Sequence, residues 1–259
     1  MQFASWPDGC PTPIVATAVH AGHTLRPEIA AVSALNDEVR RREEDPFTEF
    51  LARECGCAVV VDRSRFEVDL NRGRSEAVYL EPGDAWSLDL WSAELTEDTV
   101  ERSRVLHDRF YTRLGGLLED MVVGHGGFVL YDIHSYNHRP GGPTTPVAPA
   151  AENPVVNLGT GSLPDRWEPV ASAFATAMGS SWFKGSPIDA RQNVKFKGRY
   201  LAEFVNQRFA SVGCALAIEF KKTYMDEWTG TVDRPALNEL AAALVGTVEP
   251  VLEAYRRCL

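Results

Sequence analysis

Short apolar runs recur along the chain and alternate with stretches that have helical spacing. Five runs rich in β-branched residues predict strands, at residues 14–19, 58–62, 128–133, 155–158 and 215–220. Most of them lack a polar residue at every second position, which is typical of strands buried on both faces. We therefore expect a sheet whose two faces are both covered.

The segments between these runs include two clear helical patterns. One places apolar residues three and four positions apart, on one helix face, at Leu106, Phe110, Leu114, Leu117 and Met121. The other begins with Pro235 in its first turn and continues through Leu237, Leu240, Leu244 and Val248. Strands alternating with helices predict an α/β fold with a largely parallel sheet, in which ligand sites gather at strand ends.

The chain organisation indicates one domain over residues 1–259. The sequence contains no internal repeat, heptad pattern or long low-complexity tract that would mark a boundary. Residues 139–153, RPGGPTTPVAPAAEN, predict a long irregular loop because proline and glycine disfavour helix and strand. Long loops inside compact domains are usually functional or mobile.

Charge and composition narrow the classes of partner. A formal net charge of -10 and a pI near 5.1 argue against nucleic acid or an anionic membrane surface as the main partner. No apolar stretch approaches the ~20 residues of a membrane span, and the N-terminus lacks a signal-peptide pattern, which favours a cytoplasmic protein. Five cysteines without a secretion signal predict reduced thiols, although Cys55 and Cys57 remain weaker candidates for a metal site.

Histidines follow or end two of the predicted strands. His20 and His23 lie in a small-residue turn directly after the first strand, and His134 lies in the polar segment at the end of the 128–133 run. Asp132 shares a strand face with His134 and is a candidate to steady a ligand or the floor of the site, with a purely structural role as the alternative. Two histidines, one carboxylate and an open position form a common ligand set for catalytic zinc.

The carboxylate of that set is expected in Glu43-Glu44-Asp45, although acids at a helix start are also ordinary partners of the helix dipole. Glu44 and Asp45 are adjacent, so the sequence leaves open which of them reaches the metal. Only one acid, Glu219, interrupts the apolar run at 215–220, and a buried acid needs a partner or a task. It is our candidate general base, with a salt bridge to Lys221 or Lys222 as the alternative.

Arginines cluster in SRFEVDLNR, residues 64–72. Arg65 and Arg72, beside Asn71, are candidates to grip a substrate carboxylate through paired hydrogen bonds. The alternative is an arginine-rich surface that pairs with Asp62, Glu67 and Asp69.

These motifs together resemble the N-formylglutamate amidohydrolase family, whose members share the fold and zinc chemistry of metallocarboxypeptidases. The resemblance runs from about His20 to Gly230 and depends on HAGH, REEDPFT, SRFEVDLNR, DIHSYNHR, NLGTG and AIEFKKTYMDEWTG in that order. It implies a three-layer α/β sandwich with a central mixed, largely parallel sheet.

The resemblance also implies roles for particular residues. One Zn²⁺ per chain is held by His20, His134 and an acid from Glu44 and Asp45, with Glu219 as base. Arg65 is an oxyanion or second carboxylate contact, and the residues expected to bind substrate are Asn71, Arg72, His138, Arg139, Lys195 and Lys197. Metallocarboxypeptidases place a glutamate ligand three residues after the first histidine, where this chain has His23, so His23 is a rival ligand.

The expected activity is hydrolysis of the amide bond of an N-acyl amino acid with a free carboxylate, such as N-formylglutamate. One alternative is a metallocarboxypeptidase that trims peptide C-termini. Another is a non-catalytic protein that binds a carboxylate metabolite, for which a retained base would have no use. The expected partner in every case is a small molecule or short peptide.

Overall fold

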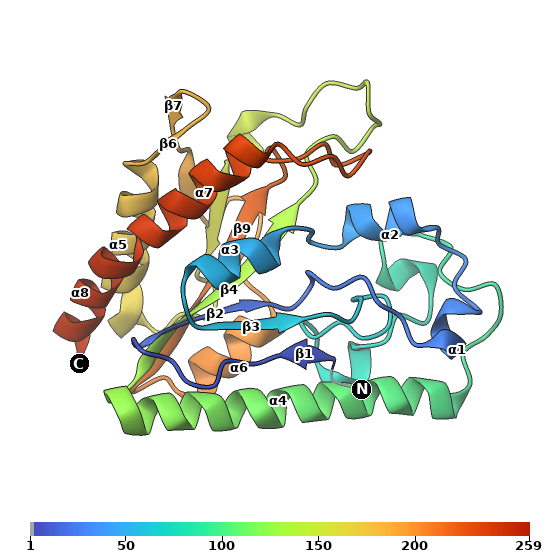
Figure 1. The fold of residues 1–259 in the computed structure, drawn as a ribbon, viewed down its shortest axis with the longest axis horizontal. Coiled ribbons are helices and arrows are strands. Elements are labelled where there is room, and N and C mark those ends of the chain that lie inside the picture. Colours follow the sequence, from blue (N-terminus) through green and yellow to red (C-terminus); the bar gives the residue numbers. More distant parts are fainter. Residues whose placement is uncertain (1–2) are drawn as a thin grey trace.

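The computed structural model describes residues 3–259 and is built around a seven-stranded sheet (Figure 1). In spatial order its strands are β1 (Ala4–Ser5), β3 (Ala58–Val61), β2 (Ile14–Ala18), β4 (Phe128–Tyr136), β9 (Gly213–Lys221), β5 (Val156–Gly159) and β8 (Ala190–Gln192). Two neighbouring pairs, β1 with β3 and β5 with β9, are antiparallel, and the others are parallel. The sheet is therefore mixed and mostly parallel, as the resemblance implies.

All five predicted strands are confirmed, with one informative difference in length. β4 continues three residues beyond the predicted end and pairs with β9 from Phe128↔Gly213 to Tyr136↔Lys221. His134 therefore lies inside a fully buried strand, as Asp132 does, rather than after it. The sequence did not predict β1, β8 or the small β6–β7 hairpin (Trp182–Phe183, Ser186–Pro187), because two or three residues are too short to show a period.

Helices cover both faces of the sheet and make three layers (Figure 1). The helices are α1 (Pro27–Ala30), α2 (Asp37–Glu43), α3 (Thr48–Glu54), α4 (Glu97–His125), α5 (Glu168–Gly179), α6 (Tyr200–Arg208), α7 (Arg234–Gly246) and α8 (Val248–Cys258). Single 3₁₀ turns lie at η1 (Arg74–Glu76), η2 (Pro82–Asp84), η3 (Ala150–Glu152) and η4 (Asp165–Trp167). One apolar core joins the sheet to α3, α5, α7 and α8, and a second joins its other face to α4 and α6.

The two predicted helical patterns are found with modified ends. α4 begins after Thr96, whose side chain accepts a hydrogen bond from the Thr99 amide, and buries the face that was predicted from its spacing. The last pattern is divided at Thr247, so that Val248 begins α8 instead of ending α7. Residues 139–153 form the predicted loop except for the single turn η3.

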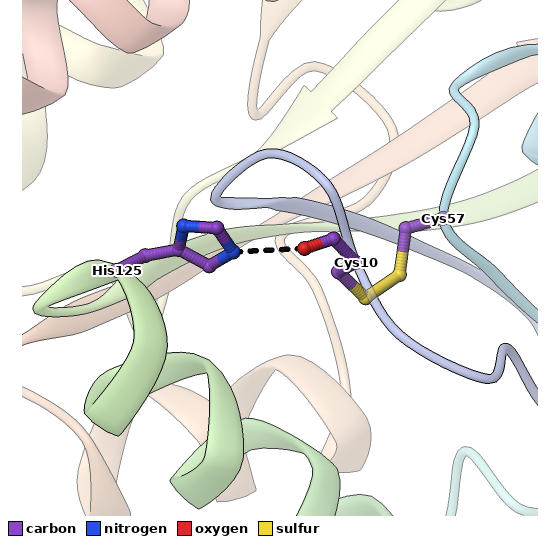
Figure 2. Close-up of a disulfide and its surroundings, with 3 residues drawn as sticks. All are labelled: Cys10, Cys57 and His125. Carbon is purple, nitrogen blue, oxygen red and sulfur yellow. Dashed lines mark hydrogen bonds between the residues drawn. A yellow bond between two sulfur atoms is a disulfide. The ribbon is translucent and has the colours of Figure 1, made fainter.

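The prediction of reduced thiols is wrong for two cysteines. Cys10 and Cys57 form a disulfide, with Cα atoms 5.1 Å apart, whereas Cys55, Cys214 and Cys258 are free (Figure 2). The His125 ring lies next to this bridge, with Nε2 2.8 Å from the Cys10 carbonyl oxygen (Figure 2). Cysteine count could not show that the segment before β2 folds back beside the start of β3. Within residues 3–259, no helix is both long and apolar enough to cross a membrane.

Candidate active site

Three buried side chains from distant segments meet at one end of the sheet. His20 follows β2, Asp45 lies between α2 and α3, and His134 lies in β4. The Nδ1 atoms of the two histidines are 3.2 Å apart, and Asp45 Oδ2 lies 3.4 Å from His20 Nδ1 and 3.2 Å from His134 Nδ1. Three potential ligand atoms thus face a common centre.

The outer nitrogen of each imidazole lies close to a carboxylate oxygen. His20 Nε2 lies 2.7 Å from Asp69 Oδ1, and His134 Nε2 lies 3.1 Å from Asp132 Oδ2. Thr17 Oγ1 donates to the other oxygen of Asp132 at 2.9 Å, which fixes that carboxylate. Carboxylates in this position orient ligand histidines and select the tautomer whose inner nitrogen is free to bind a metal. Asp132 therefore lies where it can steady His134.

The separations of these donor atoms fit a divalent metal ion. Ligands ~2.0–2.2 Å from a tetrahedral zinc ion lie roughly 3.3 Å from one another, and the three observed separations are 3.2, 3.2 and 3.4 Å. Two imidazole nitrogens and a carboxylate oxygen suit zinc and other first-row transition metals. The group His20, Asp45 and His134 can therefore bind a metal ion.

The charges of this group depend on one another. Burial would raise the pKa of Asp45, but hydrogen bonds with His134 and His20 outweigh burial and hold that pKa well below its usual value. Burial would lower the pKa of His134, but the charge and hydrogen bond of Asp132, together with Asp45, raise it well above its usual value. A proton held between these groups is one that a metal cation would displace.

The adjacent Glu44 has a different environment from Asp45. Its Oε2 lies 2.6 Å from His23 Nδ1, and its Oε1 accepts a hydrogen bond from Ser64 Oγ at 2.5 Å. His23, the rival ligand, points to Glu44 and Arg40 instead of the His20–Asp45–His134 group. The structure therefore brings Asp45, and neither Glu44 nor His23, next to the two histidines.

A buried lysine supports the segment that carries Asp45. Lys222, 1% exposed, donates from Nζ to the carbonyl oxygens of Arg42 and Glu44, each at 2.6 Å, and to Asn137 Oδ1 at 3.0 Å. All three of its protons are thus used. Lys222 follows the end of β9, so these bonds fix the Asp45 segment relative to the strand that carries Glu219.

Glu219 lies opposite His134 in the β4–β9 register and lines a cavity of about 960 Å³ that also contains His20 and Asp45. Its carboxylate forms no hydrogen bond or ion pair with any residue in the part of the chain that the structure describes. The salt bridge considered as an alternative does not form, because Lys221 and Lys222 donate to other oxygens. Burial raises the pKa of Glu219 to about 7, although His134 opposes the shift.

Arg65, Asn71 and Arg72 line the same cavity. Arg65 pairs with Asp69 at 3.0 Å, so one carboxylate contacts both His20 and Arg65. Arg72 donates to the Asp84 carbonyl oxygen at 2.6 Å, and Asn71 Nδ2 lies 3.2 Å from His134 Nε2. The sequence offered arginine–acid pairs on the surface as the alternative to a binding site. The Arg65–Asp69 pair does form, but it lies at the cavity and its carboxylate is buried.

The remaining predicted binding residues divide into two groups. Lys195 and Lys197 line the cavity, and Lys195 Nζ donates to Asn153 Oδ1 at 2.8 Å. His138 and Arg139 lie outside the cavity lining, because their backbone amides and the His138 ring contact the buried carboxylate of Glu227. The DIHSYNHR segment places them near the site, but the chain turns away after Asn137.

Two residues of the site were not recognised from the sequence. Asp69 was considered only as a surface ion-pair partner, and its contact with His20 spans 49 residues. Lys222 was considered only as a partner of Glu219. A carboxylate within an otherwise apolar VDL triplet was the available signal for Asp69, but no local pattern identifies the histidine that it supports.

Comparisons with known proteins agree with this description. The sequence model of the N-formylglutamate amidohydrolase family matches residues 12–225. An N-formylglutamate amidohydrolase from Ralstonia eutropha JMP134 superimposes with a TM-score of 0.74 and 18% identity, over 98% of each chain. A gene product from Agrobacterium tumefaciens has a TM-score of 0.62 and 17% identity, over 95% of this chain and 90% of that one. No curated protein sequence gives a significant match. Because the family model spans most of its residues, the chain belongs to the N-formylglutamate amidohydrolase family.

Proposed function

We propose that this protein is a metal-dependent amidohydrolase that cleaves an N-acyl amino acid carrying a free carboxylate into a carboxylic acid and an amine. The observation that carries the proposal is the presence of the His20–Asp45–His134 group and the unpaired Glu219 carboxylate in one cavity. Family membership supports the reaction class. N-formylglutamate is the first substrate to test, because the matching family and the Ralstonia eutropha protein carry its name.

His20, Asp45 and His134 would hold the metal through Nδ1, a carboxylate oxygen and Nδ1, and zinc is our proposed ion. When bound, the ion supplies positive charge that polarises the amide carbonyl and increases the acidity of water. Asp69 and Asp132 keep both imidazoles oriented while this occurs.

Glu219 acts as the general base in this proposal. It accepts a proton as water attacks the amide carbon, and it returns the proton to the nitrogen of the leaving amine. Its pKa of about 7 supports this role, because a base is most effective when its pKa lies near the working pH. Its freedom from any ion pair within residues 3–259 leaves the carboxylate available for proton transfer.

The arginines supply charge complementarity that the acidic surface lacks. Arg65, held by Asp69, is our candidate to stabilise the oxyanion that forms on the amide oxygen. Arg72, with Asn71 beside it, is our candidate to bind the substrate carboxylate, and Lys195 and Lys197 would add positive charge at the cavity wall. A substrate without a carboxylate would leave Arg72 Nε, which is buried and has no hydrogen-bond partner within residues 3–259, still unpaired.

The test compares wild-type protein with the Glu219→Gln variant after loading with zinc. We expect both to retain about one metal ion per chain, and we expect the variant to lose hydrolysis of N-formylglutamate by about a hundredfold or more. Full turnover by a metal-loaded Glu219→Gln variant would remove the proposed base. Including short peptides separates the amidohydrolase from the carboxypeptidase alternative, since the latter requires turnover of the peptide.

A further inference from the structure

One wall of the cavity is formed by residues that the proposed chemistry does not use. Gly83, Asp84 and Trp86 lie in and after η2, and all three line the cavity. Trp86 is 54% exposed, whereas the neighbouring rings of Phe66 and Tyr79 are almost completely buried. A tryptophan that borders an active-site cavity and remains half exposed is available to contact a bound molecule.

The backbone holds Trp86 in an unfavourable conformation. Trp86 and Ser87 have φ angles of 51° and 63°, in the left-handed region that residues other than glycine rarely adopt. The turn is maintained by hydrogen bonds from Ser87 N to Pro82 O (2.8 Å) and from Leu88 N to Ala85 O (2.9 Å). Such strain persists where the surrounding structure enforces it, and it is concentrated at functional sites.

The contacts of Trp86 connect it to the proposed reaction centre. The Arg65 guanidinium carbon lies 4.9 Å from the Trp86 ring centroid, and Arg65 pairs with Asp69, which contacts His20. The same turn contacts the candidate carboxylate-binding arginine, since the Asp84 carbonyl oxygen accepts a hydrogen bond from Arg72. A substrate group that packs on Trp86 would therefore lie close to both the amide bond that is cleaved and the carboxylate of the substrate.

The size of the cavity leaves room for such a group. N-formylglutamate has roughly 12 non-hydrogen atoms. If each is given the ~30 Å³ that one water molecule occupies in the liquid, the compound fills about 360 Å³. The cavity measures about 960 Å³. More than half of it remains when N-formylglutamate is bound.

We propose that Trp86 forms an apolar subsite and that the substrates of this protein carry an apolar, preferably aromatic, group next to the scissile amide. This inference depends on the proposed function and extends it to the substrate class. The group is either the acyl substituent or the side chain of the amino acid, because Trp86 borders both Arg65 and the Arg72 segment. Trp86 is then a specificity-determining residue that contacts substrate.

The experiment measures kcat/KM of the zinc-loaded protein for three compounds. N-formyl-L-glutamate is the reference, N-phenylacetyl-L-glutamate tests the acyl side, and N-formyl-L-phenylalanine tests the amino acid side. We expect the wild type to prefer one aromatic compound over the reference by about tenfold or more, as burial of an apolar group against a ring allows. The preferred compound identifies which side occupies the subsite.

Three variants test the role of Trp86 itself. Trp86→Ala should reduce the ratio of aromatic to reference kcat/KM by about tenfold or more, and Trp86→Phe should retain most of it. Trp182→Ala is the matched control, because Trp182 is 65% exposed in the β6–β7 hairpin and does not line the cavity. The control should leave the ratio unchanged.

Two results would overturn the subsite. One is a wild type that hydrolyses N-formylglutamate at least as efficiently as both aromatic compounds. The other is a Trp86→Ala variant in which all three values of kcat/KM fall equally, since Trp86 would then only support Arg65. If the wild type hydrolyses none of the compounds, the proposed function fails. Calorimetric binding of N-phenylacetyl-L-glutamate and of N-formyl-L-phenylalanine to Glu219→Gln and to Glu219→Gln/Trp86→Ala then tests the subsite on its own. Equal affinities of the two variants for both compounds would reject the subsite, and a tenfold weaker affinity of the double variant for either compound would support it.

Discussion

The Nδ1 atoms of His20 and His134 lie 3.2 Å apart, although 114 residues separate them in the sequence. The two residues meet because β2 and β4 are parallel neighbours in the sheet, and Asp45 reaches them from the segment before α3. The outer nitrogens of both rings face carboxylates, so the inner nitrogens are left for a cation. This relationship is the basis of the predictions that follow.

The two adjacent acids should differ in their effect on metal affinity. Asp45→Asn changes the oxygen that faces both histidines, and we expect the metal dissociation constant to rise by about a hundredfold or more. Glu44→Gln is the matched control, because Glu44 bonds to His23 and Ser64 and should change the constant by less than about tenfold. Titration against a chromophoric chelator measures both. Equal losses of metal affinity in the two variants, or a larger loss in Glu44→Gln, would show that Asp45 is not the ligand.

Lys222 should influence the metal site without touching it. Lys222→Met removes the three hydrogen bonds that hold the Arg42 and Glu44 carbonyls and Asn137, and we expect metal affinity to fall by about 10–100-fold, as for other supporting residues. Lys222→Arg should restore part of the affinity. Lys221→Met is the matched control, since Lys221 donates to the Asn153 carbonyl and should leave affinity unchanged. A variant that loses thermal stability but keeps metal affinity would limit Lys222 to a structural role.

Glu219 should give the pH profile of kcat/KM an acidic limb. The base works only as the carboxylate, so the rate should rise as pH increases through its pKa, which burial raises to about 7 in the metal-free protein. A bound cation favours the carboxylate, and the limb is therefore expected at or below pH 7. Glu219→Gln should abolish this limb along with most of the rate. A limb that persists unchanged in the residual activity of Glu219→Gln would belong to another group.

Glu227 should stabilise the protein above pH 4.5 and progressively less below it. Burial would raise its pKa, but hydrogen bonds with His138 and the Arg139 amide lower that pKa from 4.5 to about 2. A lowered folded-state pKa stabilises above the unfolded value, and this contribution disappears as pH falls from 4.5 to 2.

We therefore expect Glu227→Gln to reduce the free energy of unfolding by about 2 kcal/mol at pH 7, after allowance for solvent screening. The difference from wild type should become smaller in urea titrations at pH 4 and below. Glu249→Gln is the control, because Glu249 forms an exposed pair with Arg256 and should show no such dependence. A difference that grows toward acid would contradict the assignment.

The sequence predicted five strands of the sheet, because these strands are apolar runs with clear limits. It predicted α4 because the spacing of apolar residues repeats over many turns in a helix of 29 residues. It predicted His20 and His134 because polar residues at strand ends stand out against apolar surroundings. It could not choose between Glu44 and Asp45, because the directions of two neighbouring side chains depend on the backbone conformation of the segment, which the sequence pattern does not give. Asp69, Lys222 and the Cys10–Cys57 bridge depend on contacts between distant segments, which no local pattern records.

The central claim is that His20, Asp45 and His134 share one metal ion, and X-ray diffraction from crystals of the zinc-loaded protein at the zinc absorption edge tests it most directly. We predict a single anomalous peak per chain, ~2.0–2.2 Å from His20 Nδ1, His134 Nδ1 and an Asp45 oxygen. A peak between His23 and Glu44, or no peak in protein that retains activity, would contradict the account.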